Sequence, residues 1–498
     1  GYATCAANTT GLQNTGIGSY ALNNNVDGDN NTAVGYKALY TFEADTDGHG
    51  ENTAVGSEAF YLASTGTQNT AVGYQALRAD CTANYNTAIG WNTLKVNTTG
   101  LSNTGVGGAA LDANVDGSYN AALGVNALTT NVSGHYNVAV GHEALKTSTS
   151  SGNTAIGYHS QNKLTSGDLN VSVGKGTLYT NTVGDRNVAV GTNALYYYNP
   201  ASNEDSYNVA VGLNALNATT TGKYNTTIGG LAGAGITEGD QNTAVGHLAL
   251  DASSGTGDNN TAIGRNTLST NTSGTSNTAL GHSALAANIT GHHNIAIGDG
   301  ALYTNGDGDN SVAIGNNALY TQDPASNVDM HNIALGYDAG FSTTTGLRNC
   351  YIGNYAARSG TVANHNVALG YQALYENEDG SKSTAVGYQA LYNADPASAI
   401  DTMNVAVGYH AGIAVTTGTA NVLIGTHAGD GMQASTLNTA VGHNALSAAV
   451  DSDGLCTSIG YNTLANNTAA WSTAVGSQAL QSNTSGEKNV AVGHAALY

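Results

Sequence analysis

Small and aliphatic residues recur along this chain at a fixed spacing. The phrase NTAVGYQAL at residues 69–77 returns, slightly reworded, from the first residues to the last. We number the repeating unit so that Asn69 is position 1 and Gly73 is position 5. The equivalent glycine occurs 28 times, and 19 of the 27 intervals between these glycines are 17 residues long. The chain is therefore an array of 17-residue units with rare insertions.

Positions 1 to 4 of the unit predict a short β-strand. Position 4 is Val, Ile or Leu in all 28 units, and position 2 is usually Thr or Val, side chains that suit a pleated surface. Position 3 is Ala or Gly in 23 units. Because side chains alternate between the two faces of a strand, positions 2 and 4 share one face and the small position 3 takes the other.

Two glycine positions mark the predicted corners of the unit. Position 5 is always Gly, and position 15 is often Gly, as in Gly28 and Gly100, so both can supply a tight bend. Asn occupies position 1 in 24 units, and stacked Asn side chains form hydrogen-bonded ladders. No helical apolar face is present. We predict an all-β, parallel β-solenoid of about 29 coils, running as one continuous array over residues 1–498, with both ends in mid-repeat.

The aliphatic face of positions 2 and 4 needs a cover, because soluble monomers rarely expose a continuous apolar stripe. A second strand of the same chain at positions 8 and 9, such as Ala38-Leu39, could supply it, and so could neighbouring chains. We favour a homo-oligomer, since a 17-residue coil has little interior room. The predicted oligomer-facing residues are Val34, Val55, Val72, Ile89, Val140, Val190, Val245, Ile314, Val386 and Val441.

Composition and charge narrow the partners. The net charge is −21, and the 13 Lys and Arg are scattered singly, so no basic stripe is available for nucleic acid. No apolar run approaches the roughly 20 residues of a membrane span. The four cysteines, Cys5, Cys81, Cys350 and Cys456, fall at different positions of the unit, and we predict no disulfide between them.

Some units depart from the pattern. Four are 21 residues long, and three of these insertions hold the only prolines, which we place in protruding loops. These loops could carry specificity, although a tolerated bulge is the preferred interpretation. Other units replace Ala-Leu with Ala-Gly at positions 8 and 9, close to units with Tyr351 or Leu423 at position 3. We interpret these paired changes as compensated packing.

Candidate metal ligands were weighed against structural roles. Asp-rich turns could hold Ca²⁺, but none has the EF-hand pattern, so solvated turns are the preferred interpretation. These turns are Asp27-Gly28-Asp29, Asp45-Thr46-Asp47, Asp307-Gly308-Asp309 and Asp451-Ser452-Asp453. Histidines recur at position 6 but never in consecutive units, which argues against a metal site: His142, His247, His282, His443 and His494. No catalytic motif or cofactor fingerprint is found, so we expect no enzyme.

Tyrosines recur at positions 6 and 10, and exposed aromatic rows can stack sugars. Covering a coil corner or a neighbouring subunit is the simpler role. N-x-S/T sequons such as those at Asn97, Asn131 and Asn271 permit glycosylation in a eukaryotic host. The candidate glycan-facing residues are Tyr36, Tyr74, Tyr371, Tyr388 and Tyr409.

The repeat resembles two groups of surface proteins. The sequence SVAIG at residues 311–315 matches the repeat of trimeric autotransporter adhesin heads, and the fuller phrase NTAVGYxAL is similar to repeats of bacteriophage tail fibres. The resemblance covers the whole chain. It implies a left-handed parallel β-roll in which three chains associate side by side, on a bacterial cell surface or a virion.

We therefore expect a non-enzymatic, extracellular fibre or filament shaft, adhesin-like or tail-fibre-like, that forms a homotrimer. The alternative is a module that binds a cell-surface glycan or receptor through its Tyr or Thr rows. Ice binding would need an unbroken Thr row, but position 2 changes to Val at Val138 and Val171.

Overall fold

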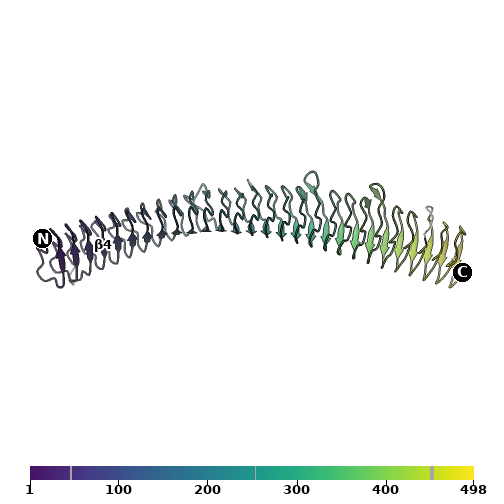
Figure 1. Ribbon diagram of the computed structural model, residues 1–498, viewed down its shortest axis with the longest axis horizontal. Coiled ribbons are helices and arrows are strands. Elements are labelled where there is room, and N and C mark those ends of the chain that lie inside the picture. The colour runs from purple at the N-terminus through teal and green to yellow at the C-terminus, as the bar shows by residue number, and fades with distance from the viewer. Residues whose placement is uncertain (45–47, 253, 449–453) are drawn as a thin grey trace. The chain divides into compact units, whose positions relative to one another are not determined.

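The computed structural model describes residues 1–498 except 45–47, 253 and 449–453. The chain divides into two compact units, which are described separately: unit 1 is Gly1–Ala244 with Ser253–Thr256, and unit 2 is Val245–Ala252 with Gly257–Tyr498. Each unit is a parallel β-solenoid, and the chain makes about 28 turns (Figure 1). Helix is absent from the described residues, so they contain no helix that could cross a membrane.

Nearly every coil contributes one strand of three residues. Unit 1 contains β1 (Thr15–Ile17), β2 (Thr32–Val34), β3 (Thr53–Val55), β4 (Thr70–Val72), β5 (Thr87–Ile89), β6 (Thr104–Val106), β7 (Ala121–Leu123), β8 (Val138–Val140), β9 (Thr154–Ile156), β10 (Val171–Val173), β11 (Val188–Val190), β12 (Val209–Val211) and β13 (Thr226–Ile228). A further strand is β14 (Thr243–Val245).

Unit 2 repeats the same element and adds four two-residue strands. Its strands are β15 (Thr261–Ile263), β16 (Thr278–Leu280), β17 (Ile295–Ile297), β18 (Gly308–Asp309), β19 (Val312–Ile314), β20 (Val328–Asp329), β21 (Ile333–Leu335), β22 (Cys350–Ile352), β23 (Val367–Leu369), β24 (Gly380–Ser381), β25 (Thr384–Val386), β26 (Ile400–Asp401), β27 (Val405–Val407), β28 (Val422–Ile424), β29 (Thr439–Val441), β30 (Thr457–Ile459), β31 (Thr473–Val475) and β32 (Val490–Val492).

Consecutive strands pair in parallel with every repeat position aligned. In unit 1, β3 and β4 pair with Ala54 opposite Ala71 and Val55 opposite Val72. In unit 2, β16 and β17 pair in the same way. The expected alternation is confirmed, because Ala71 at position 3 is fully buried whereas Val72 at position 4 is only half-buried.

The second strand considered at positions 8 and 9 does not form. These residues form a turn, and Leu39 at position 9 has a φ of 49°, in the left-handed region. Its backbone N–H donates to the carbonyl of Ala59 in the next coil at 3.0 Å, so the turns are linked from coil to coil without forming a strand. The Leu39 side chain is fully buried inside the coil with the small Ala33 and Ala38.

Glycine is invariant at the first corner and frequent at the second, for different reasons. At position 5, Gly73 has a φ of 135°, and a Cβ built there would lie 2.4 Å from the carbonyl oxygen of Gly90 in the next coil. All 28 position 5 glycines share this conformation. At position 15, Gly100 has no positive φ, but its Cβ would lie 2.3 Å from the Gly117 oxygen. This second corner needs only close approach.

The Asn ladder expected at position 1 is confirmed. The backbone N–H of Asn120 donates to Asn103 Oδ1 at 3.0 Å, and that of Asn137 donates to Asn120 Oδ1 at 3.0 Å. A second ladder, not foreseen, runs at position 12, where Asn114 Nδ2 donates to Asn97 Oδ1 at 2.6 Å. Both ladders are buried, so the interior of the solenoid contains polar side chains whose hydrogen bonds link consecutive coils.

The second ladder also answers the question of the sequons. Asn97 and Asn131 are fully buried, and the Asn131 amide donates to Asn114 Oδ1 at 2.9 Å. Asn271 is buried as well. A glycan on any of these amides would have to displace the ladder, so in the folded chain these sequons are structural positions.

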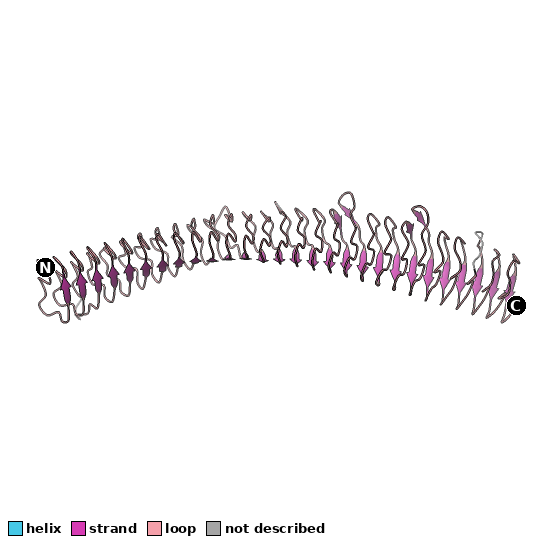
Figure 2. Cartoon of the chain, in the orientation of Figure 1, coloured by secondary structure: helices cyan, strands magenta, loops and turns pink. Residues whose placement is uncertain are grey.

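The insertions extend the coil at one edge. In unit 2, β18 pairs with β20 and β24 pairs with β26, so each loop returns onto the preceding coil (Figure 2). Pro200, Pro324 and Pro396 lie in the inserted loops, as predicted, but their own side chains are buried, and the residues after them are exposed. The Pro396 ring packs at the Gly380 corner, because a Cβ on that glycine would lie 3.1 Å from Pro396 Cδ.

Compensated packing is confirmed in the Ala-Gly units. Tyr351 is 1% exposed, and a Cβ on Gly340 would lie 2.7 Å from its ring. Leu423 fills the same kind of space: the Cβ of Gly412 would lie 2.6 Å from its side chain, and that of Gly429 would lie 2.7 Å away. All four cysteines are free, as expected.

Candidate functional site

The aliphatic face of positions 2 and 4 lies on the outside of the coil. None of the ten stripe residues is buried; Ile89 is 39% exposed and Ile314 is 38% exposed. The Leu side chains of position 9 point inward, as Leu77 does, so they leave this face open. The interpretation that positions 8 and 9 of the same chain cover this face is therefore wrong. In the single chain, each unit exposes the aliphatic face along its coils.

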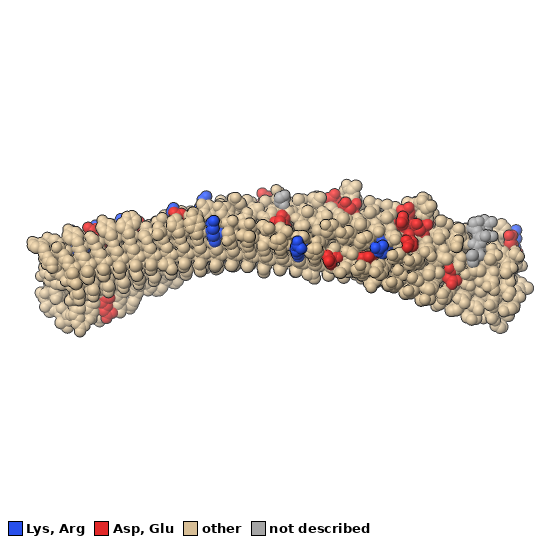
Figure 3. Space-filling view, in the orientation of Figure 1, with Lys and Arg blue, Asp and Glu red and all other residues tan. Residues whose placement is uncertain are grey.

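Charge is sparse over the visible surface of both units. Figure 3 shows that most of this face is formed by uncharged residues, with Lys, Arg, Asp and Glu at scattered points. The chain has 34 acidic and 13 basic side chains among 498 residues. The recognition chemistry of this surface therefore rests on aliphatic, aromatic, hydroxyl and amide groups.

The five tyrosines named as candidate glycan-facing residues are all exposed. Tyr371, Tyr388 and Tyr409 form a continuous stack, with ring centroids 5.3 Å apart at each step and planes inclined by 13°. Tyr36 instead packs edge-on against Tyr20. The rings of the stack face one another, so sugar could reach only their edges and the outer face of a terminal ring.

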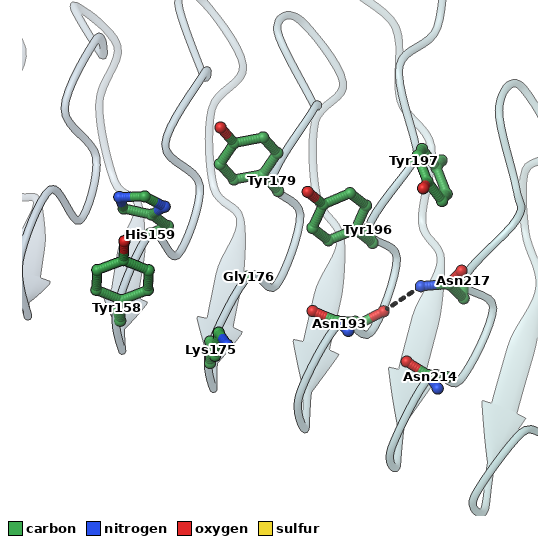
Figure 4. Close-up of a pocket in the computed structure, with 10 residues that line it drawn as sticks. All are labelled: Tyr158, His159, Lys175, Gly176, Tyr179, Asn193, Tyr196, Tyr197, Asn214 and Asn217. Atoms are coloured by element: carbon green, nitrogen blue, oxygen red, sulfur yellow. Dashed lines mark hydrogen bonds between the residues drawn. The ribbon is translucent and has the colours of Figure 1, made fainter.

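A groove of about 380 Å³ on unit 1 is lined by aromatic side chains in a different place (Figure 4). Tyr179 and Tyr196 stack at 5.1 Å, and Tyr197 meets Tyr196 edge-on at 4.8 Å. Asn217 Nδ2 donates to the Asn193 carbonyl oxygen at 3.0 Å, which fixes one wall. The lining residues are Tyr158, His159, Lys175, Gly176, Tyr179, Asn193, Tyr196, Tyr197, Asn214 and Asn217.

A glycine at position 7 opens this groove. Gly176 has a φ of 64°, and a Cβ there would lie 2.8 Å from Asn193 Oδ1 and 3.3 Å from the Tyr196 ring. Most units carry a larger residue at this position, which would fill the space in front of the next coil's tyrosine. Gly300 repeats the arrangement in front of Tyr320. The signal was present in the sequence but was not recognised, since position 7 was not considered as a site.

A second cluster, around position 7, contains two histidines and a glutamate. His142 at position 6 lies beside Glu143 at position 7 and His159 at position 7 of the next coil, and one ligand atom from each lies within 4.8 Å of the others. The expectation that no metal site forms considered only histidines at position 6 and therefore missed His159. His282 Nδ1 lies 3.0 Å from Asp299 Oδ1, but this pair offers only two possible ligands, against three in the cluster of His142, Glu143 and His159.

The Asp-rich turns use their carboxylates to hold the neighbouring coil. Asp29 Oδ1 accepts from the Leu12 N–H at 2.6 Å, and Asp309 Oδ1 accepts from the His292 N–H at 2.6 Å. The turns at 45–47 and 451–453 lie outside the described residues. In the part of the chain that is described, these turns bring no three acidic groups to ligand distance of one another.

Comparison with known proteins adds no family. No family model matches the chain. A search of curated proteins gives no match either. The adhesin-like and tail-fibre-like character of the repeat stays a prediction from the sequence, while the parallel β-solenoid with a 17-residue period is a property of the structure.

Proposed function

We propose that this protein is a non-enzymatic structural fibre or filament shaft, adhesin-like or tail-fibre-like, that acts extracellularly on a cell or virion surface. Its chains associate side by side as a homo-oligomer, with a trimer favoured. The observation that carries the proposal is the aliphatic face of positions 2 and 4, which each unit exposes along consecutive coils.

The construction of the coil supports a mechanical role. Each coil contacts its neighbours in sequence through the in-register strands and two buried Asn ladders, as in other solenoid proteins. A stack of this kind gives a stiff rod-like element from a short repeating sequence. Every coil carries an aliphatic side chain at the same repeat position. Several chains can therefore lie parallel with their repeats aligned.

The proposal is tested by the mass of the purified chain in solution. Light scattering coupled to size-exclusion chromatography should give three times the chain mass of 50.1 kDa, and electron micrographs should show unbranched rods. A concentration-independent monomer would refute side-by-side association. Antibody labelling of intact cells or virions of the source would test the surface location separately.

A second function, glycan binding, is favoured by the groove on unit 1. Its walls combine the ring edges of the stacked Tyr179 and Tyr196 with the exposed Tyr197 ring and amide groups at Asn193 and Asn214, and aromatic rings with amides suit the apolar face and the hydroxyls of a sugar.

Filling the groove tests this second function without removing its aromatic rings. Asn is the residue at position 7 in several coils, including Asn193 and Asn214, with the same left-handed backbone, so Gly176→Asn should fold normally. It should abolish glycan-array binding, as should Tyr196→Ala. Tyr392→Ala, which removes a ring stacked on Tyr375 at 5.0 Å outside the groove, should retain it. Binding that survives Gly176→Asn would refute the groove as the site.

A further inference from the structure

We propose that His142, Glu143 and His159 form a binding site for a divalent transition-metal ion of the Zn²⁺ type on unit 1. The three side chains each offer one ligand atom, and these atoms lie within 4.8 Å of one another. The site joins two consecutive coils, because His142 and Glu143 belong to one coil and His159 to the next. It does not depend on the proposed fibre function, and it borders the groove on unit 1, which Tyr158 and His159 also line.

The repeat itself brings two of the ligands together. Glu143 and His159 both occupy position 7, where the backbone adopts the left-handed conformation, with φ values of 56° and 55°. Equivalent residues of adjacent coils lie about 4.8 Å apart in a parallel sheet. The backbone N–H of His159 donates to the His142 carbonyl at 3.1 Å, which holds the second histidine against the first coil. Two ligands at one repeat position thus face one another by construction.

The distance between the ligand atoms fits a metal. Glu143 Oε2 lies 3.1 Å from His159 Nε2. Bonds of about 2.0–2.2 Å to one zinc ion at a tetrahedral angle place two ligand atoms roughly 3.4 Å apart, so this pair needs little movement. His142 is exposed, and rotation of its ring can bring its nitrogen to the same ion. Three protein ligands leave a fourth position open to water or an outside donor.

Surrounding residues orient the ligands. The Tyr158 ring stacks on the His159 imidazole at 3.8 Å and lies 5.6 Å from that of His142, with planes inclined by 22° and 16°. Asn162 Nδ2 donates to the Glu143 main-chain carbonyl at 3.1 Å and lies 3.4 Å from Glu143 Oε2, so it also contacts the ligating carboxylate. Contacts of this kind restrict the rotation of the ligating side chains, as supporting residues do in metal sites.

The positive charge of Lys146 should repel a metal cation bound at this site. Its Nζ lies 2.8 Å from Glu143 Oε1, the carboxylate oxygen that does not face His159. A metal on Oε2 leaves this ion pair in place but must tolerate the ammonium charge nearby. Removing Lys146 should therefore strengthen metal binding, whereas a purely structural cluster of hydrogen bonds would show no such effect.

The donor set selects the class of ion. Two imidazole nitrogens and one carboxylate suit Zn²⁺, Cu²⁺ or Ni²⁺. Ca²⁺ requires six to eight oxygen ligands and Mg²⁺ an octahedron of oxygens, which one carboxylate cannot provide.

The experiment uses the full chain without an affinity tag. Equilibrium dialysis against Zn²⁺ at pH 7.5 should find one ion per chain bound with a dissociation constant of about 10 μM or tighter. With Co²⁺ as the probe, visible absorption should report a site with nitrogen and oxygen ligands. His159→Ala and the isosteric Glu143→Gln should each weaken binding at least about tenfold, and Lys146→Ala should tighten it.

His282→Ala is the matched control, since His282 also bridges consecutive coils to an acidic partner but belongs to a pair rather than a trio. It should leave the affinity unchanged, and circular dichroism should confirm that each variant is folded. Unchanged Zn²⁺ affinity in both His159→Ala and Glu143→Gln would overturn the inference. A dissociation constant above about 1 mM for the unmodified chain would overturn it too.

Discussion

Placing charges on the aliphatic face should dissociate the oligomer. The variant that tests this carries Val55→Asp, Val72→Asp and Ile89→Asp, at position 4 of three consecutive coils in unit 1. In the single chain these residues are half-buried or exposed, so an aspartate can keep its carboxylate in water and the coil should remain folded. In the oligomer the same carboxylates would be taken out of water without a partner.

The magnitude follows from the exposure of the face. Covering a Val, Leu or Ile side chain completely contributes about 1.5–3 kcal/mol. Ile89 is 39% exposed in the single chain, so covering the remainder contributes about 0.6–1.2 kcal/mol. Val55 and Val72 are less exposed, so the three positions together contribute at most roughly 2–4 kcal/mol. Each unpaired carboxylate adds a desolvation penalty of several kcal/mol. A total above about 4 kcal/mol raises the dissociation constant at least about a thousandfold.

The control adds equal charge elsewhere on the same coils. Thr65, Thr82 and Thr99 occupy position 14 and are exposed, and Asp116 shows that this position accepts aspartate. The triple Thr→Asp variant should keep the mass of the unmodified protein by light scattering at micromolar concentration, whereas the position 4 variant should have the mass of one chain. If both variants kept the oligomer mass, the face of positions 2 and 4 would not be the interface.

Three further predictions concern the coil itself. Gly73→Ala should lower the melting temperature, because of its φ of 135° and the carbonyl 2.4 Å from the added Cβ, whereas Gly108→Ala, with open space around its Cβ, should not. In a thermodynamic cycle, Gly412→Ala and Leu423→Ala should be coupled by at least about 1 kcal/mol, since the Cβ at 412 collides with Leu423 and this clash, the shortest of its contacts, is removed once that side chain is shortened; additive effects would contradict this. Burial raises the pKa of the Cys81 thiol to about 11, so the unfolded chain ionises first as pH rises. Stability should therefore fall between about pH 9 and 11 by on the order of 2–3 kcal/mol, and Cys81→Ala should lose that part of the fall in urea titrations.

The strand and its ladder could be predicted because they depend on alternation and on period. Aliphatic residues at positions 2 and 4 around a small position 3 fix which side faces inward, and the constant spacing aligns Ala54 with Ala71 and Asn103 with Asn120. The invariant glycine of position 5 identified the corner by its own conformational freedom. These inferences need only local geometry and the repeat.

The turns could not be predicted, because ordinary residues adopt the left-handed conformation there. Gln75, Leu77 and Tyr85, at positions 7, 9 and 17, have φ values of 54°, 52° and 63°. Non-glycine residues take this region rarely, and no local propensity favours it for Leu or Tyr. Closure of the coil imposes it, and this closure turns Leu inward and brings position 7 next to position 10. The groove depends on that juxtaposition and was therefore missed, whereas the histidine cluster was missed because only position 6 was considered, although Glu143 and His159 share position 7.

The Asn ladder gives the coil a direction of growth. Asparagine side chains at position 1 accept a hydrogen bond from the backbone N–H of the coil that follows, as Asn103 does from Asn120 and Asn120 does from Asn137. Once one coil has formed, its position 1 side-chain oxygen is a free hydrogen-bond acceptor, and the backbone N–H that binds it lies about 17 residues further along the chain. Closing so short a loop is fast. As the chain emerges from the ribosome, each finished coil can serve as the template for the next, so folding should proceed as a zipper from the N-terminal side and keep pace with synthesis.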